Sequence, residues 1–394
     1  HRDLHSFPTR RSSDLVLVVR AVAGTGKSAL LAQFYQTWKS HHPEVPVVAH
    51  YMSMAGNNRS ARGILESLGQ QLRSAGRLDE ELEILPERLL SQIRSAMQSQ
   101  TQPLLLLLDG LDESDEDAQE LFWLPETLPS CFRVVVTTRP VAVWERIRQR
   151  PHVVELELPP LEDQEIREII AAYQGRHRLD LSSEEQGSLA QRAAGNPLFL
   201  KVALEEMARG GLAVGQLATT VDALFSQILQ RLCGSCGETA IHDYLGLIAA
   251  GRSGLTEAEL REIIHEDHPV TATEDFFLLV SGALANFVIP REKMLAFFHP
   301  EFERSVKMLL GKGGMRTYHK RLALHFSTRW RFYERALLEL PYQLQSAEQY
   351  EELLRTLTDI SFLESKTSAN MLVELRQDFQ YALEARAVDR KSVV

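Results

Sequence analysis

One stretch near the start of the chain, residues 16–30 (VLVVRAVAGTGKSAL), limits the possible fold more than any other feature of the sequence. Its four apolar residues 16–19 predict a buried parallel strand, and a helical pattern begins directly after the glycines. Between strand and helix, residues 21–28 satisfy the pattern G-x-x-x-x-G-K-[ST], except that Ala21 holds the first glycine position. A strand, a glycine-rich turn and a helix N-terminus in this order predict a phosphate-binding loop; the alternative is a chance glycine turn before a helix.

Each residue type in this loop has a task in holding phosphate. Glycines let backbone N–H groups turn inward, and the helix N-terminus adds the positive end of a dipole. The ammonium of Lys27 is expected to reach the β- and γ-phosphates, and the hydroxyl of Ser28 is expected to bind Mg²⁺. The expected nucleotide-binding residues are Gly24, Thr25, Gly26, Lys27, Ser28 and Ala29.

A run of five leucines, residues 104–108, ends in an aspartate and predicts the second half of the site. The run is expected to be a buried strand whose C-terminal end points at the ligand crevice. Asp109 is placed to hold Mg²⁺, because a carboxylate at the end of an all-leucine strand needs a partner such as a metal. Asp112 and Glu113 follow in the loop, where a carboxylate can orient or deprotonate the attacking water; the alternative is a solvated acidic loop.

Strands and helices alternate from residue 16 to 158, which predicts a parallel α/β sheet. The strand expected at 132–138 (FRVVVTT) ends in Arg139. Its guanidinium is expected to contact the γ-phosphate from the tip of the strand beside Asp109; the alternative is an ordinary surface arginine. We therefore expect Lys27, Asp109, Asp112, Glu113 and Arg139 to carry the chemistry.

Beyond residue 158 the pattern turns helical. Residues 159–220 are expected to form a helical lid, interrupted by the turn G-N-P at 195–197, which could equally be a simple helix break. In 221–312, helices followed by a hairpin around 291–293 predict a winged helix. Such a domain would first suggest DNA binding, but the helix at 256–264 (TEAELREII) is acidic and offers phosphates a poor surface.

An all-α region is expected at 313–388, with helices at 318–332 and 369–387 among its elements. Basic residues gather at its start and could suggest RNA. The apolar residues interleaved with them favour an amphipathic helix with a basic outer face. The basic residues are Arg316, Lys320, Arg321, Arg329 and Arg331.

The two ends of the chain differ from the rest. Residues 1–15 resemble the in-frame translation of a common sequencing adapter, and 389–394 resemble the same adapter read on the opposite strand. We expect both to be artefacts of that origin, so that the natural segment is 16–388. The whole chain has a formal charge of −10, and the segment 16–388 carries −12, which disfavours a general nucleic-acid surface. No apolar run approaches the length of a membrane span, and three cysteines fit a reducing, cytoplasmic compartment.

Taken together, these motifs resemble the NACHT group of STAND signalling NTPases. The resemblance rests on the phosphate loop, the run LLLLLDGLDE, the strand FRVVVTTRP, the G-N-P turn, the winged helix and the helical tail. Residues 336–366 look like the segment that precedes WD40 repeats in NACHT–WD40 and telomerase-associated-protein-like chains. If so, a repeat sensor would follow this chain and an effector domain would precede it, each meeting its own protein partners.

The resemblance implies roles that spacing alone does not. Pro197 would contact the adenine, and His299 would hold the β-phosphate of ADP from the winged helix. In the family an aspartate often follows this histidine, whereas Pro300 follows it here. The implied function is a switch, closed with ADP and opened by ATP and Mg²⁺, that self-associates on activation and hydrolyses ATP slowly. Two other functions stay open: a scaffold that binds ATP without hydrolysing it, and a STAND-type transcriptional regulator.

Overall fold

The computed structural model describes residues 16–52, 59–83, 85–177, 179–252, 254–268, 273–291, 293–372, 374–379 and 381–383. Both adapter-like ends, 1–15 and 389–394, therefore lie outside the described residues. The chain divides into two compact units, His1–Leu224 and Phe225–Val394, and the division falls within helix α9 (Val221–Cys236).

The first unit is built on a five-stranded sheet with the order β2-β3-β4-β1-β5, in which every neighbouring pair is parallel. The parallel α/β core expected from the sequence is confirmed. Because all strands run the same way, the loops that leave their C-terminal ends meet at one edge of the sheet. The strands are β1 (Val16–Arg20), β2 (Val47–Tyr51), β3 (Leu104–Asp109), β4 (Phe132–Thr138) and β5 (Val153–Glu157).

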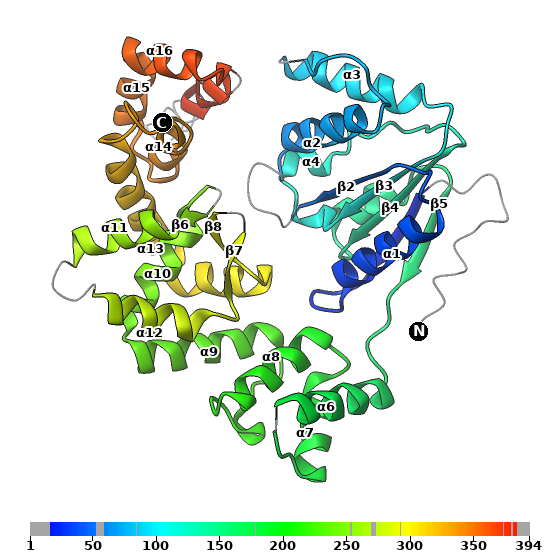
Figure 1. Cartoon of the computed structure of the whole chain (residues 1–394), viewed down its shortest axis with the longest axis vertical. Coiled ribbons are helices and arrows are strands. Elements are labelled where there is room, and N and C mark those ends of the chain that lie inside the picture. Colours follow the sequence, from blue (N-terminus) through cyan, green and yellow to red (C-terminus); the bar gives the residue numbers. More distant parts are fainter. Residues whose placement is uncertain are drawn as a thin grey trace, which may run out of the picture. The chain divides into compact units, whose positions relative to one another are not determined.

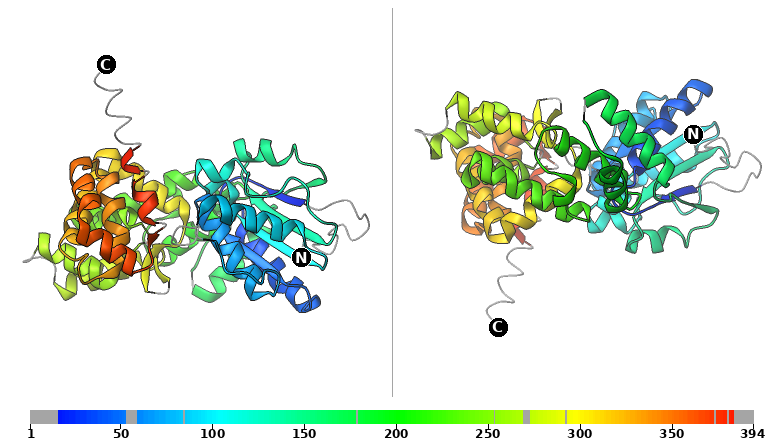
Figure 2. Two further views of the ribbon diagram at one scale, coloured as in Figure 1. Left: turned by 90° about the horizontal axis from the view of Figure 1, so that it is seen from above. Right: turned by 90° about the horizontal axis from the view of Figure 1, so that it is seen from below.

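Helices cover both faces of this sheet, as Figure 1 shows for α1 on one face and for α2 and α3 on the other. The alternating residues of β3 explain the two layers, since Leu105 and Leu107 pack with α1 whereas Leu104, Leu106 and Leu108 pack with α2 and α3. Figure 2 shows the same sheet from two further sides, with α1 as the darkest blue helix. The covering helices are α1 (Lys27–His41), α2 (Ala61–Ser74), α3 (Pro86–Gln98), α4 (Glu116–Gln119) and α5 (Ala142–Ile147).

The lid expected at 159–220 is helical and belongs to the first unit. Ser182 and Glu185 form a capping box, with the Glu185 N–H donating to the Ser182 hydroxyl at 3.2 Å and the Ser182 N–H donating to the Glu185 carboxylate at 2.9 Å. The lid consists of α6 (Asp163–His177), α7 (Ser183–Ala193), α8 (Pro197–Ala208) and the short 3-10 helix η3 (Val214–Gln216).

The second unit begins as a winged helix, as the sequence predicts. Strands β7 (Val288–Arg291) and β8 (Met294–Phe297) form the antiparallel hairpin, and β6 (Leu255–Thr256) pairs with β8. The helices of this unit are α9, α10 (Glu238–Ala250), α11 (Glu257–Asp267), α12 (Glu274–Leu284), α13 (Pro300–Ser327), α14 (Glu334–Ser346), α15 (Tyr350–Thr358) and α16 (Ile360–Ser368).

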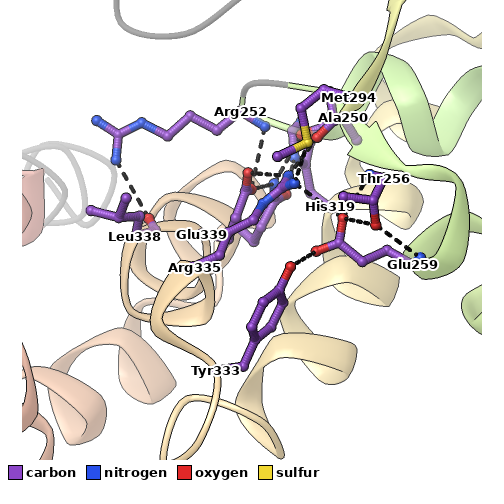
Figure 3. A network of polar contacts seen from close by, with 12 residues as sticks. Ala250, Arg252, Thr256, Glu259, Met294, His319, Tyr333, Arg335, Leu338 and Glu339 are labelled. Carbon is purple, nitrogen blue, oxygen red and sulfur yellow. Dashed lines mark hydrogen bonds and ion pairs between the residues drawn. The ribbon is translucent and has the colours of Figure 1, made fainter. Parts of the chain in front are cut away.

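A buried polar network ties the winged helix to the helices that follow it (Figure 3). The guanidinium of Arg335 donates to Glu259 on α11 at 3.0 Å and to Glu339 on α14 at 2.9 Å. The amide of Gln343 continues the network, donating to the Glu339 carboxylate at 2.8 Å and to the Ala250 carbonyl of α10 at 2.9 Å. Since the side chains of Glu259 and Glu339 are only 6% and 3% exposed, these bonds are shielded from water. The network makes the winged helix and α14 parts of one packed body.

The helical region differs from expectation in two places. The domain boundary expected at 312/313 stays a prediction; next to it Gly311, at φ 64°, kinks α13 and divides it into two helical parts. The helix expected at 318–332 is the second part of α13 and already ends at Ser327. The last helix does not begin at 369, because the unpredicted α16 occupies Ile360–Ser368 and Asn370, at φ 56°, turns the chain.

No helix within the described ranges combines the length and the apolar character that a membrane span needs.

Candidate functional site

The loop between β1 and α1 has the shape that the sequence predicts. Gly24 and Gly26 have φ values of 76° and 90°, a region that residues with a Cβ rarely adopt. Gly26 is the N-cap of α1 and supplies no side-chain cap, so the first N–H groups of the helix face outward from its end. Ser28 and Ala29 are exposed on this first turn. These backbone donors and the Ser28 hydroxyl are the groups that phosphate and Mg²⁺ require.

Side chains hold the carbonyl oxygens of this loop in place. The Lys27 ammonium donates to the carbonyls of Ala21 and Val22 at 3.0 and 2.9 Å, and the Thr25 hydroxyl donates to Val22 at 2.8 Å. Ala21, the departure from the usual glycine, is buried and its N–H donates to the Thr138 carbonyl at 3.3 Å. Because the C=O and N–H of a planar peptide unit point in opposite directions, fixing the carbonyls also fixes the N–H groups.

The lid contacts the loop directly through the first residues of α8. The side-chain amide of Asn196 donates to the Ala23 carbonyl at 3.1 Å, and the Leu198 N–H donates to the Gly24 carbonyl at 3.1 Å. A Cβ added at Gly24 would lie 2.9 Å from both the Asn196 Oδ1 and the Leu198 Cβ, so only glycine permits this approach. Pro197 stands between these two residues in the sequence. The G-N-P turn thus begins α8 and also carries a residue that is bonded to the phosphate loop, Asn196.

Local sequence explains why α8 begins at this point. Asn196 is a favourable N-cap, its Oδ1 accepting from the Phe199 N–H at 3.0 Å, and Pro197 fits the first helical position because it has no N–H to satisfy. Gly195 has φ 75°, and a Cβ there would lie 2.5 Å from Pro160. The turn is therefore packed against the segment that enters the lid.

The carboxylates after β3 lie at the same edge of the sheet as the loop. β4 separates β1 from β3, so Asp109 lies two strand spacings, about 10 Å, from the strand that leads into the loop. Asp109 is 2% exposed, and its Oδ1 accepts a hydrogen bond from the Thr137 hydroxyl at 2.5 Å. Tyr51 is its neighbour on β2, and burial, followed by the charge of Asp109, raises the pKa of the Tyr51 hydroxyl.

Three more of the predicted catalytic residues lie beside Asp109: Asp112, Glu113 and Arg139. The Arg139 N–H donates to the Asp112 Oδ1 at 2.9 Å, and its guanidinium Nε donates to the Asp112 Oδ2. The Asp112 side chain is 2% exposed and that of Arg139 is 28% exposed, so this ion pair is largely shielded from solvent. Glu113 folds back over Gly110, where an added Cβ would lie 3.4 Å from the Glu113 Cδ. The structure therefore pairs Asp112 with Arg139 and leaves Glu113 next to the Asp109 turn.

His299 belongs to the second unit, where it is the N-cap residue of α13 directly after β8. Its carbonyl accepts from the Phe302 N–H at 3.0 Å, and its ring lies 6.1 Å from that of Phe225 and 4.5 Å from that of Phe298. The placement between hairpin and helix agrees with the sequence prediction. Its predicted contact with ADP stays a prediction.

Two residues that touch the site were not predicted. From the sequence, Asn196 is expected only as part of a turn; its capping preference is readable from sequence, but its bond to Ala23, 173 positions away, is not. Thr137 is expected only as a strand residue, and its bond to Asp109 depends on the register of β3 against β4.

The residues present fit a magnesium nucleotide. Mg²⁺ is commonly held by one or two protein oxygens together with water and substrate phosphates, and the Ser28 hydroxyl and Asp109 carboxylate are oxygens of this kind. Among the described residues, no group of three or more His, Cys, Asp or Glu side chains is arranged to hold a metal by itself.

The charges of the winged helix bear on whether this domain could bind nucleic acid. Helix α12, which precedes the hairpin and would take the place of a recognition helix, contains Glu274 and Asp275 and no basic residue. Of the five basic residues expected to gather here, Arg316 pairs with Glu348, and Arg321 pairs with Asp243 and Asp267. Arg329 likewise pairs with Glu262 and Glu266.

The phosphate loop, the carboxylate that ends β3 and the all-parallel sheet define a P-loop nucleoside triphosphatase, a class that binds and hydrolyses nucleotides with Mg²⁺. The family model for the NACHT domain matches residues 15–176, and the resemblance to the NACHT group expected from the sequence is confirmed over this part of the chain. The match extends past the core expected at 16–158 and takes in most of α6.

Relatives of known sequence are repeat proteins much longer than this chain. A TPR repeat-containing protein of Dictyostelium discoideum is 22% identical over 91% of this chain and 25% of its own length. The NACHT and WD repeat domain-containing protein 2 of Mus musculus is 25% identical over 68% of this chain and 17% of its own length. The chain thus spans a quarter or less of these relatives. Their names include TPR repeats as well as WD repeats, whereas the sequence led us to expect WD40 repeats alone.

Among solved structures, a Walker-type ATPase of Pyrococcus abyssi has 13% sequence identity and a TM-score of 0.35, covering 74% of this chain and 91% of that one. A TM-score this low adds nothing to the assignment, which rests on the strand order, the phosphate loop and the family match.

Proposed function

We propose that this chain is a nucleotide-operated switch of the STAND class, closed with ADP, opened by ATP and reset by slow hydrolysis. The observation that carries the proposal is the contact between lid and phosphate loop, in which Asn196 and Leu198 bind the carbonyls of Ala23 and Gly24. A loop that rearranges around a different number of phosphates must strain or release these two bonds. Nucleotide state is thereby passed to α8, which is the first requirement of a switch.

The residues of the loop and of the strand ends divide the work. N–H groups of Gly24 to Ala29 hold the phosphates, and the Lys27 ammonium exchanges its loop carbonyls for the β- and γ-phosphates. Mg²⁺, held by Ser28 and Asp109, neutralises charge on the phosphate oxygens. Glu113 orients the attacking water, because Asp112 is engaged by Arg139. Asp112 in turn presents Arg139 toward the γ-phosphate from the tip of β4.

Two further contacts come from the family resemblance. Pro197, which lies between the two lid residues bonded to the loop, contacts the adenine, and His299 holds the ADP β-phosphate in the closed state. ATP favours the open state only by the difference between its affinities for the two states. Opening exposes surfaces through which copies of the chain assemble.

Partners and location follow the same reasoning. The repeat regions named in the relatives suggest protein partners that bind outside this chain. The acidic α12 and the ion-paired Arg321 and Arg329 disfavour a role on DNA or RNA. We place the protein in the cytoplasm, because its three cysteines are free, as a reducing compartment keeps them.

The test is to identify the nucleotide that the protein carries. The 394-residue chain is purified, denatured, and its released nucleotide quantified by chromatography. We expect close to one ADP per chain in the wild type, little in Lys27→Ala, and a reduced amount in His299→Ala. Lys39→Ala is the matched control, because Lys39 lies near the other end of α1, where its ammonium donates to the Tyr35 hydroxyl at 3.5 Å.

Each other outcome counts against the proposal in a different way. Tightly held ATP that persists for hours with Mg²⁺ would indicate the non-hydrolysing scaffold. A folded wild type that neither carries nor binds adenine nucleotides would show that the phosphate loop does not have this function. Equal ADP in wild type and Lys27→Ala would remove the loop from the site.

A further inference from the structure

One side chain at the site has no part in the roles described so far. Thr137 is the sixth residue of β4, is 1% exposed, and lies beside Asp109 across the strand pair. Its hydroxyl donates to the Asp109 Oδ1 at 2.5 Å and accepts from the Gly110 N–H at 2.8 Å. Thr137 is thus bonded both to the carboxylate that ends β3 and to the peptide that turns the chain away from it.

The directions of these two bonds are fixed by donor and acceptor chemistry. A backbone N–H can only donate, so the Gly110 bond makes the Thr137 oxygen an acceptor. The single hydroxyl proton is then left for Asp109, and a hydroxyl bound to a carboxylate gives a short, strong hydrogen bond. Gly110 has φ 71°, which sets the turn that brings its N–H to Thr137. The Thr137 hydroxyl therefore has one available orientation.

This arrangement restricts Asp109 as well. Among the described residues, Thr137 is the only side chain that hydrogen-bonds to Asp109, and it uses Oδ1 alone. With Oδ1 engaged and the side chain 2% exposed, the carboxylate plane is held and Oδ2 is the oxygen left for another ligand.

We propose that Thr137 is a positioning residue that orients Asp109 for Mg²⁺, so that the affinity for the metal depends on the Thr137 hydroxyl. The inference rests on the proposed function, since it concerns the metal of the same nucleotide site. It adds a residue on β4 that touches neither nucleotide nor metal and acts only through Asp109.

The chain offers a matched control in the next residue. Thr138 is 0% exposed on the same strand, and its hydroxyl donates to the Arg139 carbonyl at 3.1 Å, away from Asp109. Replacing either threonine by valine removes one buried hydroxyl and keeps the side-chain shape. Only the change at Thr137 removes a bond to Asp109.

The experiment measures the Mg²⁺ concentration at which the affinity for a fluorescent ADP analogue reaches half of its full increase. The full chain is freed of nucleotide, and each variant is titrated first in EDTA and then with rising Mg²⁺. We expect Thr137→Val to raise this concentration by about 10- to 100-fold, the usual cost of losing a partner that orients a metal ligand. Thr137→Ser and Thr138→Val should stay within about threefold of wild type. Affinity in EDTA should be the same for all, and Mn²⁺ resonance spectra with ADP should show the same order of metal binding.

A double-mutant cycle separates positioning from general damage. If Thr137 acts through Asp109, then Thr137→Val should have no further effect on the Mg²⁺ midpoint in an Asp109→Asn background. Additive effects, or an unchanged midpoint in Thr137→Val, would overturn the inference while leaving the proposed function standing. Should Thr137→Val not fold, Thr137→Ser decides, because a midpoint shifted by loss of the methyl group would assign Thr137 to packing. A wild type that binds no nucleotide would instead contradict the proposed function, and this inference with it.

Discussion

Buried charged groups occur in two regions of this protein, and the two differ in how those groups are satisfied. In the second unit, Arg335 lies between Glu259 and Glu339, and Gln343 extends the network to α10. In the first unit, Asp109 has one oxygen engaged by Thr137, and Lys27 donates to carbonyls of its own loop. The network around Arg335 joins helices to one another. The groups around Asp109 and Lys27 instead gather at the ends of strands, beside a loop with positive φ angles.

The difference shows that burial alone does not mark a functional site. Glu339 is as buried as Asp109, each residue as a whole being 2% exposed, yet its partners lie on its own helix α14 and on the chain after α10, and they hold these two segments together. The groups at the sheet edge instead surround backbone donors that no side chain caps. We therefore expect substitutions in the network to act on stability and substitutions at the sheet edge to act on ligand binding.

The largest expected effect comes from breaking the network at its centre. Arg335→Ala leaves the carboxylates of Glu259 and Glu339 without their shared cation, and removing one partner of a buried ion pair costs about 3–5 kcal/mol. We expect a loss of this size in the free energy of unfolding, measured by urea denaturation followed by circular dichroism.

The control for this substitution is another arginine of the same unit. Arg355 pairs with Glu351 one helical turn away, with side chains 75% and 84% exposed, so Arg355→Ala should change the free energy of unfolding by less than about 1 kcal/mol. If the two alanine variants were equally stable, the network would not have the structural role assigned to it.

The same two regions show how far the sequence alone predicts this protein. Local patterns were sufficient where one stretch determines its own structure: the strand, loop and helix at 16–30, the leucine strand ending in Asp109, and the hairpin after α12 are all present. Caps were also predictable, since Ser182 and Thr256 form capping boxes with the residues three positions on.

Contacts between distant stretches could not be predicted. The bonds of Thr137 to Asp109 and of Asn196 to Ala23 depend on strand register and on where the lid packs, and no local pattern carries that information. The same holds for Arg335, which a helical pattern places on α14 without indicating that it would meet Glu259, 76 positions earlier. Sequence reasoning thus predicted the elements of the site and the residues at their ends, but not the bonds that orient them.

A smaller effect is expected where the lid meets the loop. Asn196→Asp keeps a good N-cap for α8 but removes the N–H that donates to the Ala23 carbonyl. Loss of one hydrogen bond of about 1 kcal/mol corresponds to roughly fivefold faster release of ADP, measured by displacement of a fluorescent analogue. Hydrogen exchange in the first turn of α8 should also respond less to nucleotide than in the wild type.

Ser182→Ala serves as the comparison for the lid. It weakens the capping box of α7 in the same lid without touching the loop, so ADP release should be unchanged. Equal acceleration in both variants would mean that lid stability in general, and not the bond to Ala23, sets the release rate. Residues at the sheet edge would then act through stability, as the residues of the network do, and the contrast between the two regions would fail.

The smallest expected effect concerns pH and belongs to the second unit. His325 on α13 is 3% exposed, and burial, followed by the nearby Arg329, lowers the pKa of its imidazole. A lowered pKa in the folded state means that the unfolded chain binds more protons, so stability is full above about pH 6.5 and falls as the solution is acidified below it. One group of this kind contributes at most about 1.4 kcal/mol per pH unit.

His325→Leu removes this contribution and should flatten the fall in the free energy of unfolding between pH 7.5 and 5.5. Asp378 acts in the opposite direction, because burial raises its pKa to about 6 and the folded state then binds the extra proton. Since Asp378 is present in both proteins, the difference between the two pH profiles isolates His325. Parallel profiles would show that the imidazole titrates alike in the folded and unfolded chain, and would contradict this prediction.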